Sequence, residues 1–158
     1  MPEDFLHRVV HESLVDVLEK MFFISILDET SDSVPLPVRD EMAVRVAFEG
    51  EPSGSLIVRL NRFVARSIAG DFLGVEQEEL SDSQVGEVMC ELANMICGSV
   101  LSRVESAVTF RLNAPEIVDP GQTPAAAATY SAPLGPAAIK VAMVTEAPIC
   151  SPAAEYAS

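Results

Sequence analysis

Basic side chains and cysteines are both scarce in this sequence. Its 158 residues include 10 Lys and Arg against 24 Asp and Glu, which gives a formal net charge of −14 at pH 7. A chain this acidic repels phosphate groups, so neither nucleic acid nor a membrane is expected as a partner. The cysteines are Cys90, Cys97 and Cys150, and none of them stands in a CxxC spacing. Thiols without a pairing pattern indicate a reducing compartment, so we expect a cytoplasmic protein.

Long apolar runs and cofactor-binding motifs are also lacking. The longest strongly apolar run, Met21 to Leu27, is too short to cross a bilayer. The acidic start, MPEDFLHRVV, has neither the positive charge nor the apolar stretch of a signal peptide. No Walker loop, GxGxxG turn or GxSxG elbow occurs. We therefore expect that the chain binds no cofactor of its own.

The length of the chain suits one domain, which we expect over residues 1–146, with a flexible tail over residues 147–158. Apolar residues spaced i, i+3, i+4 predict a first helix from Pro2 to about Phe22. Apolar and polar residues then alternate over Met42–Phe48 and Leu56–Leu60, which predicts a hairpin with one face toward a core.

A second helix is predicted between Asn61, as its N-terminal cap, and Gly74, as a left-handed terminating residue. Its inward positions would be Val64, Ile68 and Phe72. The other expected segments are a connection over 28–41, a strand over 107–112, a proline-bounded turn over 113–121, an alanine- and threonine-bearing run ending at Tyr130, a turn over 132–136 and a last strand over 138–146.

The third predicted helix carries an unusual polar stripe. A capping box of Ser81 and Gln84 starts this helix, which should run to about Glu105. Four residues at spacings of 4, 3 and 4 fall on one narrow stripe of this helix: Glu87, Glu91, Asn94 and Gly98. The opposite side carries the apolar residues Val85, Met89, Leu92 and Ile96. An amide is a poor interior helix residue, so Asn94 calls for a reason outside helix formation.

The stripe resembles the signature of a known family. The stretch ELANMICG, with Glu87 four residues before its Glu and Pro115 downstream, is similar to the motif of the CheC/CheX/FliY family of chemotaxis phosphatases. The order of the predicted elements is similar to that family over nearly the whole chain. The resemblance implies an α+β fold in which two long helices pack on a mainly antiparallel sheet. It also implies a homodimer in which edge strands join across the two subunits.

The resemblance implies a function as well. The substrate would be the phosphorylated aspartate of a CheY-like response-regulator receiver domain, and the receiver domain would supply the Mg²⁺. Asn94 would position the attacking water, and Glu91 would pair with the receiver's active-site lysine, so these two are the expected catalytic residues. Glu87 and Gly98 are expected to contact the partner, since Gly98 lets another surface come close.

The sequence departs from the family pattern at two places. Glu87 stands where the pattern has Asp or Ser, so we assign it no catalytic role. The first helix echoes the third weakly, with Leu18 matching Leu92, but it has Val17 and Lys20 where a second site would need Glu and Asn. These residues favour the one-site CheX type over the two-site CheC type.

Two other functions are open from the residues alone. A binding module could recognise a receiver domain or another signalling protein through the same helix without catalysis. A metal hydrolase could use His7 and His11, which lie four apart on the first helix, although the sequence places no third ligand. For Cys90 and Cys97, burial as small apolar side chains is the preferred interpretation.

Overall fold

The computed structural model describes residues 2–21, 40–104, 109–122, 128–134 and 137–146. The helices are α1 (Pro2–Met21), α2 (Arg62–Leu73) and α3 (Asp82–Ser102), with short 3₁₀ turns η1 (Gln77–Glu79) and η2 (Pro120–Gln122). The strands are β1 (Glu41–Glu49), β2 (Gly54–Asn61), β3 (Arg111–Leu112), β4 (Glu116–Val118), β5 (Ala128–Leu134) and β6 (Ala137–Thr145).

The strands form one antiparallel sheet in the order β3-β1-β2-β6-β5, with β4 also paired to β1. The predicted hairpin of β1 and β2 is present, and Val44 lies opposite Val58 in it. Because the two edges are formed by β5 on one side and by the short β3 and β4 on the other, the longest strands are central. The expected α+β fold with a mainly antiparallel sheet is confirmed.

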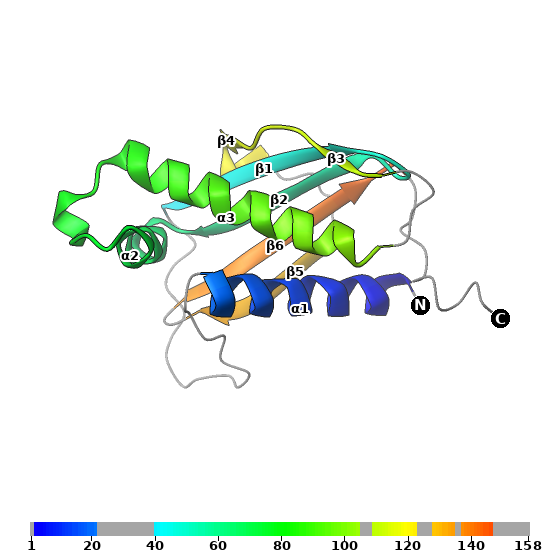
Figure 1. Cartoon of the computed structure of the whole chain (residues 1–158), viewed down its shortest axis with the longest axis horizontal. Coiled ribbons are helices and arrows are strands. Elements are labelled where there is room, and N and C mark those ends of the chain that lie inside the picture. Colours follow the sequence, from blue (N-terminus) through cyan, green and yellow to red (C-terminus); the bar gives the residue numbers. More distant parts are fainter. Residues whose placement is uncertain (1, 22–39, 105–108, 123–127, 135–136, 147–158) are drawn as a thin grey trace.

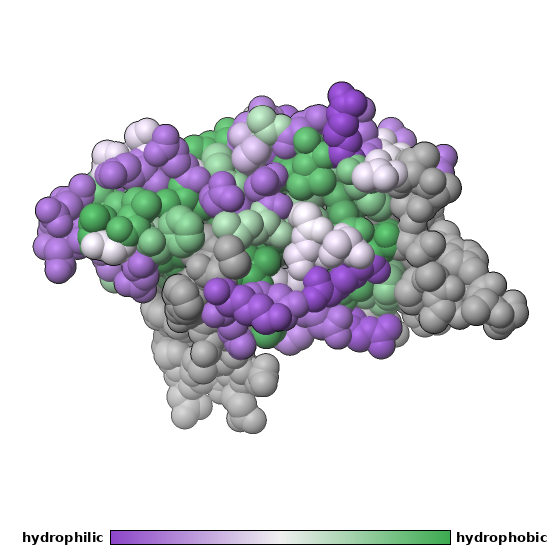
Figure 2. All heavy atoms as spheres, viewed as in Figure 1, coloured by the Kyte–Doolittle hydropathy of each residue, from purple (hydrophilic) through white to green (hydrophobic). Residues whose placement is uncertain are grey.

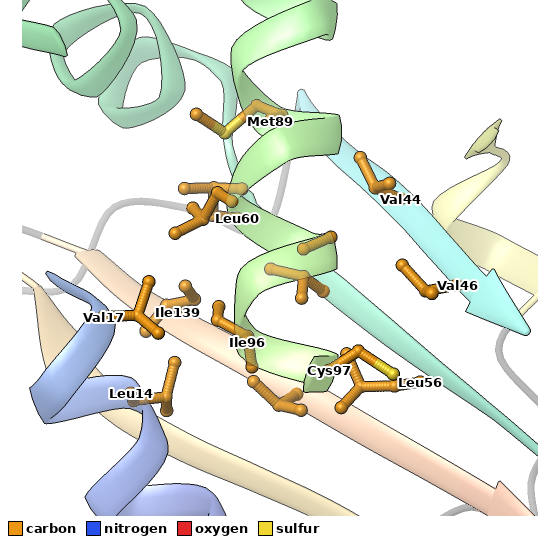
Figure 3. Close-up of a cluster of buried hydrophobic side chains, with 14 of the residues drawn as sticks. Leu14, Val17, Val44, Val46, Leu56, Leu60, Met89, Ile96, Cys97 and Ile139 are labelled. Carbon is orange, nitrogen blue, oxygen red and sulfur yellow. The ribbon is translucent and has the colours of Figure 1, made fainter. Parts of the chain in front are cut away.

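Helices α1 and α3 cover one face of this sheet side by side and run in opposite directions (Figure 1). Their apolar stripes meet the inward residues of β1, β2 and β6, where Val17, Ile96, Leu60 and Ile139 pack together (Figure 3). Full burial of one such aliphatic side chain contributes about 1.5–3 kcal/mol. This packing holds α3 rigidly, with one long side against the core and the other toward solvent.

The predicted ends of the helices are confirmed at three of the signals in the sequence. The Asn61 side chain accepts a hydrogen bond from the Phe63 backbone N–H at 2.7 Å, and Gly74 ends α2 with φ of 71°. Ser81 and Gln84 form the reciprocal capping box at the start of α3, with N···O distances of 2.9 and 3.1 Å. The register of α3 is therefore fixed from its first turn.

Some predicted boundaries were wrong. α3 ends at Ser102 rather than near Glu105, because Arg103 leaves the helix and its N–H bonds to the Val100 carbonyl in a tighter turn. Phe72 is 40% exposed, not inward, since it lies in the last turn of α2 beyond the buried residues of that helix. Within the described residues of the strand expected over 107–112, only Arg111–Leu112 is strand.

The proline-rich segments also differ from expectation. The turn predicted over 113–121 contains β4, because the backbone between Pro115 and Pro120 pairs with β1 at the sheet edge. β5 continues past Tyr130 to Leu134, so the turn expected over 132–136 was wrong for residues 132–134, which are strand. Pro133 is tolerated there because β5 is an edge strand. Most of the connection expected over 28–41 and the tail expected over 147–158 lie outside the described residues.

Among the described residues, α3 is the one helix whose length and composition would allow it to span a membrane. More than half of its apolar window is buried, against α1 and the sheet. Its hydropathy is therefore accounted for by its central place in the core of the fold.

Candidate functional site

The polar stripe of α3 lies where the sequence predicted it. Glu87 and Glu91 are exposed, and Asn94 and Gly98 are half-buried at the same surface. The opposite side of the helix is buried, as expected, and comprises Val85, Met89, Leu92 and Ile96. One rigid helix thus presents two carboxylates, one amide and one bare backbone position along a single line.

The amide and the two carboxylates of the stripe form no hydrogen bond or ion pair with the described part of the chain. The Asn94 amide takes part in no hydrogen bond there, and neither Glu87 nor Glu91 forms an ion pair with a described residue. Within the described residues, the two donors and the acceptor of the amide are therefore unused. The same holds for the carboxylate of Glu91, one turn before Asn94.

Two glycines of α3 have different surroundings. A Cβ added at Gly98 would meet no atom within 4 Å, so the space above the stripe at this position is open. A Cβ added at Gly86 would lie 2.7 Å from Cδ1 of Ile117, so this glycine is in contact with β4. Gly98 therefore meets the structural requirement of its predicted role, and Gly86 fixes how close β4 lies to the helix.

Pro115 reaches the flank of the site through the pairing of β4 with β1. The N–H of Asn113 donates to the Ala47 carbonyl at 2.8 Å, and Glu116 lies opposite Arg45. The Arg45 guanidinium donates to the Glu116 carboxylate on the sheet face away from the helices. Pro115 is therefore held in a segment that follows β1 beside α3, a closeness that the sequence alone does not reveal.

The cysteines of α3 are protonated thiols at neutral pH. Burial raises the pKa of the Cys97 thiol to about 12. Burial, with the nearby Glu87 carboxylate, also raises the pKa of Cys90. Cys97 is completely buried and Cys90 packs against the apolar core, so both thiols have the apolar surroundings that the sequence interpretation expected.

The first helix offers no comparable stripe. Val17 is buried at 6% exposure, and the exposed Lys20 lies 3.8 Å from Asp16 in an ion pair. Asp16 also accepts a hydrogen bond from Arg103, whose guanidinium donates to Ser99 Oγ at 2.6 Å. This side of α1 is engaged in holding the two helices together.

His7 and His11 are both exposed on α1, and the ring of His7 lies 5.1 Å from that of Tyr130. Across the ranges that the structure covers, no three His, Cys, Asp or Glu side chains come together as a metal site would require. The metal-hydrolase hypothesis thus gains no third ligand from the fold.

Comparison with known proteins gives a family match and several similar folds. The profile of the family described as chemotaxis phosphatase CheX matches residues 42–134, which include the whole of α3 and β4. No curated protein matches the sequence significantly.

Three solved structures illustrate the similarity of fold. The CheX–CheY–BeF₃–Mg²⁺ complex from Borrelia burgdorferi matches with a TM-score of 0.70 and 16% identity over 89% of this chain and 97% of that one. CheX from Vibrio vulnificus matches with a TM-score of 0.67 and 18% identity over 89% and 96% of the two chains. FliY from Thermotoga maritima matches with 0.58 and 15% over 92% and 90%.

Proposed function

The chain belongs to the CheX family of chemotaxis phosphatases, and on that premise we propose that it dephosphorylates the aspartyl phosphate of a CheY-like receiver domain in the cytoplasm. The observation that supports this proposal most directly is the Asn94 amide, which has no hydrogen bond within the described residues and lies one turn from Glu91. The similar solved structures share less than a fifth of their residues with this chain and therefore show the fold alone. The proposed chemistry depends on the side chains of this chain.

Asn94 acts on water. Its amide oxygen accepts a hydrogen bond from a water molecule while its NH₂ group donates to the phosphoryl oxygens, which places the water in line with the scissile bond. The water oxygen forms a bond to phosphorus as the bond from phosphorus to the aspartate oxygen breaks, releasing phosphate and a free carboxylate. An amide suits this position because it brings no negative charge toward the phosphoryl group.

Glu91 sets the register of docking. Its carboxylate pairs with the lysine that a receiver domain keeps beside its phosphorylation site, and a charge-assisted hydrogen bond of this kind fixes direction as well as distance. Mg²⁺ is supplied by the receiver domain and offsets the charge of the phosphoryl group. The Borrelia burgdorferi complex, in which CheX occurs with CheY, BeF₃ and Mg²⁺, makes this partner and this source of metal the reasonable choice.

The test is the decay of a phosphorylated receiver domain in the presence of the protein. The wild type should accelerate decay, and Asn94→Ala should lose about 100-fold of that acceleration, because misplacing the water by an ångström has an effect of this size. Asn94→Asp is the matched variant, since it keeps the shape and adds a charge, and it should be equally impaired. Binding should persist in Asn94→Ala.

Binding of the receiver with an unaltered decay rate would contradict the phosphatase proposal. That result would identify the protein as a receiver-binding module that uses the same helix.

We also propose a homodimer in which edge strands of two subunits join. β5 is the longer of the two edges, and in the described residues it pairs with β6 alone. Among the described strands, this edge leaves backbone groups unpaired, which a second copy can satisfy. A monomeric mass by sedimentation equilibrium at micromolar concentration would rule this out.

A further inference from the structure

Ile117 is an apolar side chain in an unexpected place. It is 55% exposed, whereas the other large exposed apolar side chains in the described residues belong to α2 and the turn after it. The exposed apolar side chains of α2 form a hydrophobic area at the end of the molecule that α2 occupies (Figure 2). Ile117 instead belongs to β4, beside the helix that carries the polar stripe.

The pairing of β4 directs Ile117 toward the helix layer. Ile117 lies opposite Val44 in the antiparallel pair, and directly opposed residues project to the same face of a sheet. Val44 is buried under the helices, so Ile117 projects to the same side, where β4 lies next to α3 (Figure 1). On the other face, the Arg45–Glu116 ion pair holds β4 in this position.

Gly86 allows Ile117 to approach the helix backbone. A Cβ at Gly86 would lie 2.7 Å from Cδ1 of Ile117, which is too close for both atoms to keep their places. The next residue is Glu87, the first member of the polar stripe. Ile117 therefore lies at the border of that stripe, in the space that a side chain at position 86 would otherwise occupy.

On the side of α3 next to Ile117, the residue between Gly86 and Asn94 is uncharged. Cys90 lies one helical turn after Gly86 and one turn before Asn94, and its thiol is half-buried and neutral. Pro115, half-buried, precedes β4 on the same flank. We name Ile117, Cys90 and Pro115 the apolar ledge. It runs beside the carboxylates and the amide in a protein whose net charge is −14.

We propose that the apolar ledge, and Ile117 above all, packs against an apolar side chain of the receiver domain next to its phosphorylation site. This inference rests on the proposed function. The carboxylate and amide of the stripe give direction but little net affinity, because they exchange water for partner groups of similar strength. Apolar area removed from water supplies affinity without regard to direction, and Ile117 is the ledge residue with the most area to bury.

The experiment measures KM and kcat for a phosphorylated receiver domain, and Kd for the same receiver loaded with beryllium fluoride and Mg²⁺. Ile117→Ser should raise KM and Kd about tenfold, which is the effect of leaving one aliphatic side chain unburied, with kcat unchanged. Ile117→Val should keep most of the affinity. Gly86→Ala should raise KM as well, since its methyl group displaces Ile117.

The matched control is Phe63→Ser. Phe63 is 62% exposed and lies at the start of α2, so its replacement removes as much exposed apolar surface away from the ledge. Equal Kd values for Ile117→Ser and the wild type would overturn the proposal, as would an equal loss in Phe63→Ser. Thermal unfolding of each variant confirms that the fold is kept.

The two proposals fail in different ways. A wild type that binds the loaded receiver without accelerating decay would end the phosphatase proposal, while Kd would still decide on the ledge. A wild type that accelerates decay but is indifferent to Ile117→Ser would end the ledge alone. A wild type that does not bind any receiver tested would overturn both.

Discussion

Replacing Gly98 by alanine should stabilise the fold and weaken receiver docking at the same time. Glycine in a helix interior is less favourable than alanine by about 1 kcal/mol. At Gly98 the added Cβ would meet nothing within 4 Å, so no clash offsets that gain. For a domain of this size, a gain of about 1 kcal/mol corresponds to a melting temperature higher by about 2–4 °C.

The same methyl group should reduce activity. Gly98 lies one turn after Asn94 on the face proposed to enter the receiver, where an added carbon would hold the two surfaces apart. A loss of about 1.4 kcal/mol in docking would raise KM for the phosphorylated receiver about tenfold. Melting is followed by circular dichroism, and KM by phosphate release.

Gly86→Ala provides the comparison on the same helix. Its intrinsic helix gain is equal, but its Cβ would lie 2.7 Å from Ile117, so a smaller rise in melting temperature is expected. An unchanged melting temperature for Gly98→Ala would refute the open-space reasoning. A higher melting temperature with unaltered KM would refute the claim that a partner approaches closely at Gly98.

Two further predictions concern α3 itself. Ser81→Ala removes the acceptor of the Gln84 N–H and should lower the unfolding free energy in urea by about 1 kcal/mol; an equal loss in Ser83→Ala, which lies in the same turn without a capping role, would contradict this. Because the folded pKa of Cys97 is raised from 9.0 to about 12, its stabilising contribution is complete below pH 9 and falls between pH 9 and 12. The unfolding free energy should therefore drop from pH 8 to pH 10 by about 1 kcal/mol more in the wild type than in Cys97→Ala, and parallel slopes would show that the thiol does not titrate on unfolding.

Local signals made α3 predictable. Its capping box lies within four residues, and its apolar period of 3.6 divides the helix into a buried and a polar side. The stripe from Glu87 to Gly98 follows from that division alone. The placement of the candidate site was therefore available from sequence, while the roles of its residues came from family resemblance.

The flank of the site was not predictable in the same way. The three residues of β4 lie between Pro115 and Pro120, so the composition of this segment indicates a turn. Its pairing with β1 depends on residues that are distant in the sequence. The sequence signal for the approach of β4 to α3 was Gly86. A glycine on the buried side of a helix marks a place where another element comes close, and here that element is Ile117.

The difference between the two long helices follows from what covers them. Leu18 of α1 and Leu92 of α3 occupy matching places in the sequence echo, and both are completely buried. The preceding residues differ, since Val17 is buried while Glu91 is exposed. A glutamate at 17 would be placed in the core between the helix and the sheet, at the cost of an unpaired buried charge. The burial of α1 at position 17, and not only its residue types, thus explains why the exposed pair of carboxylate and amide occurs on α3 and not on α1.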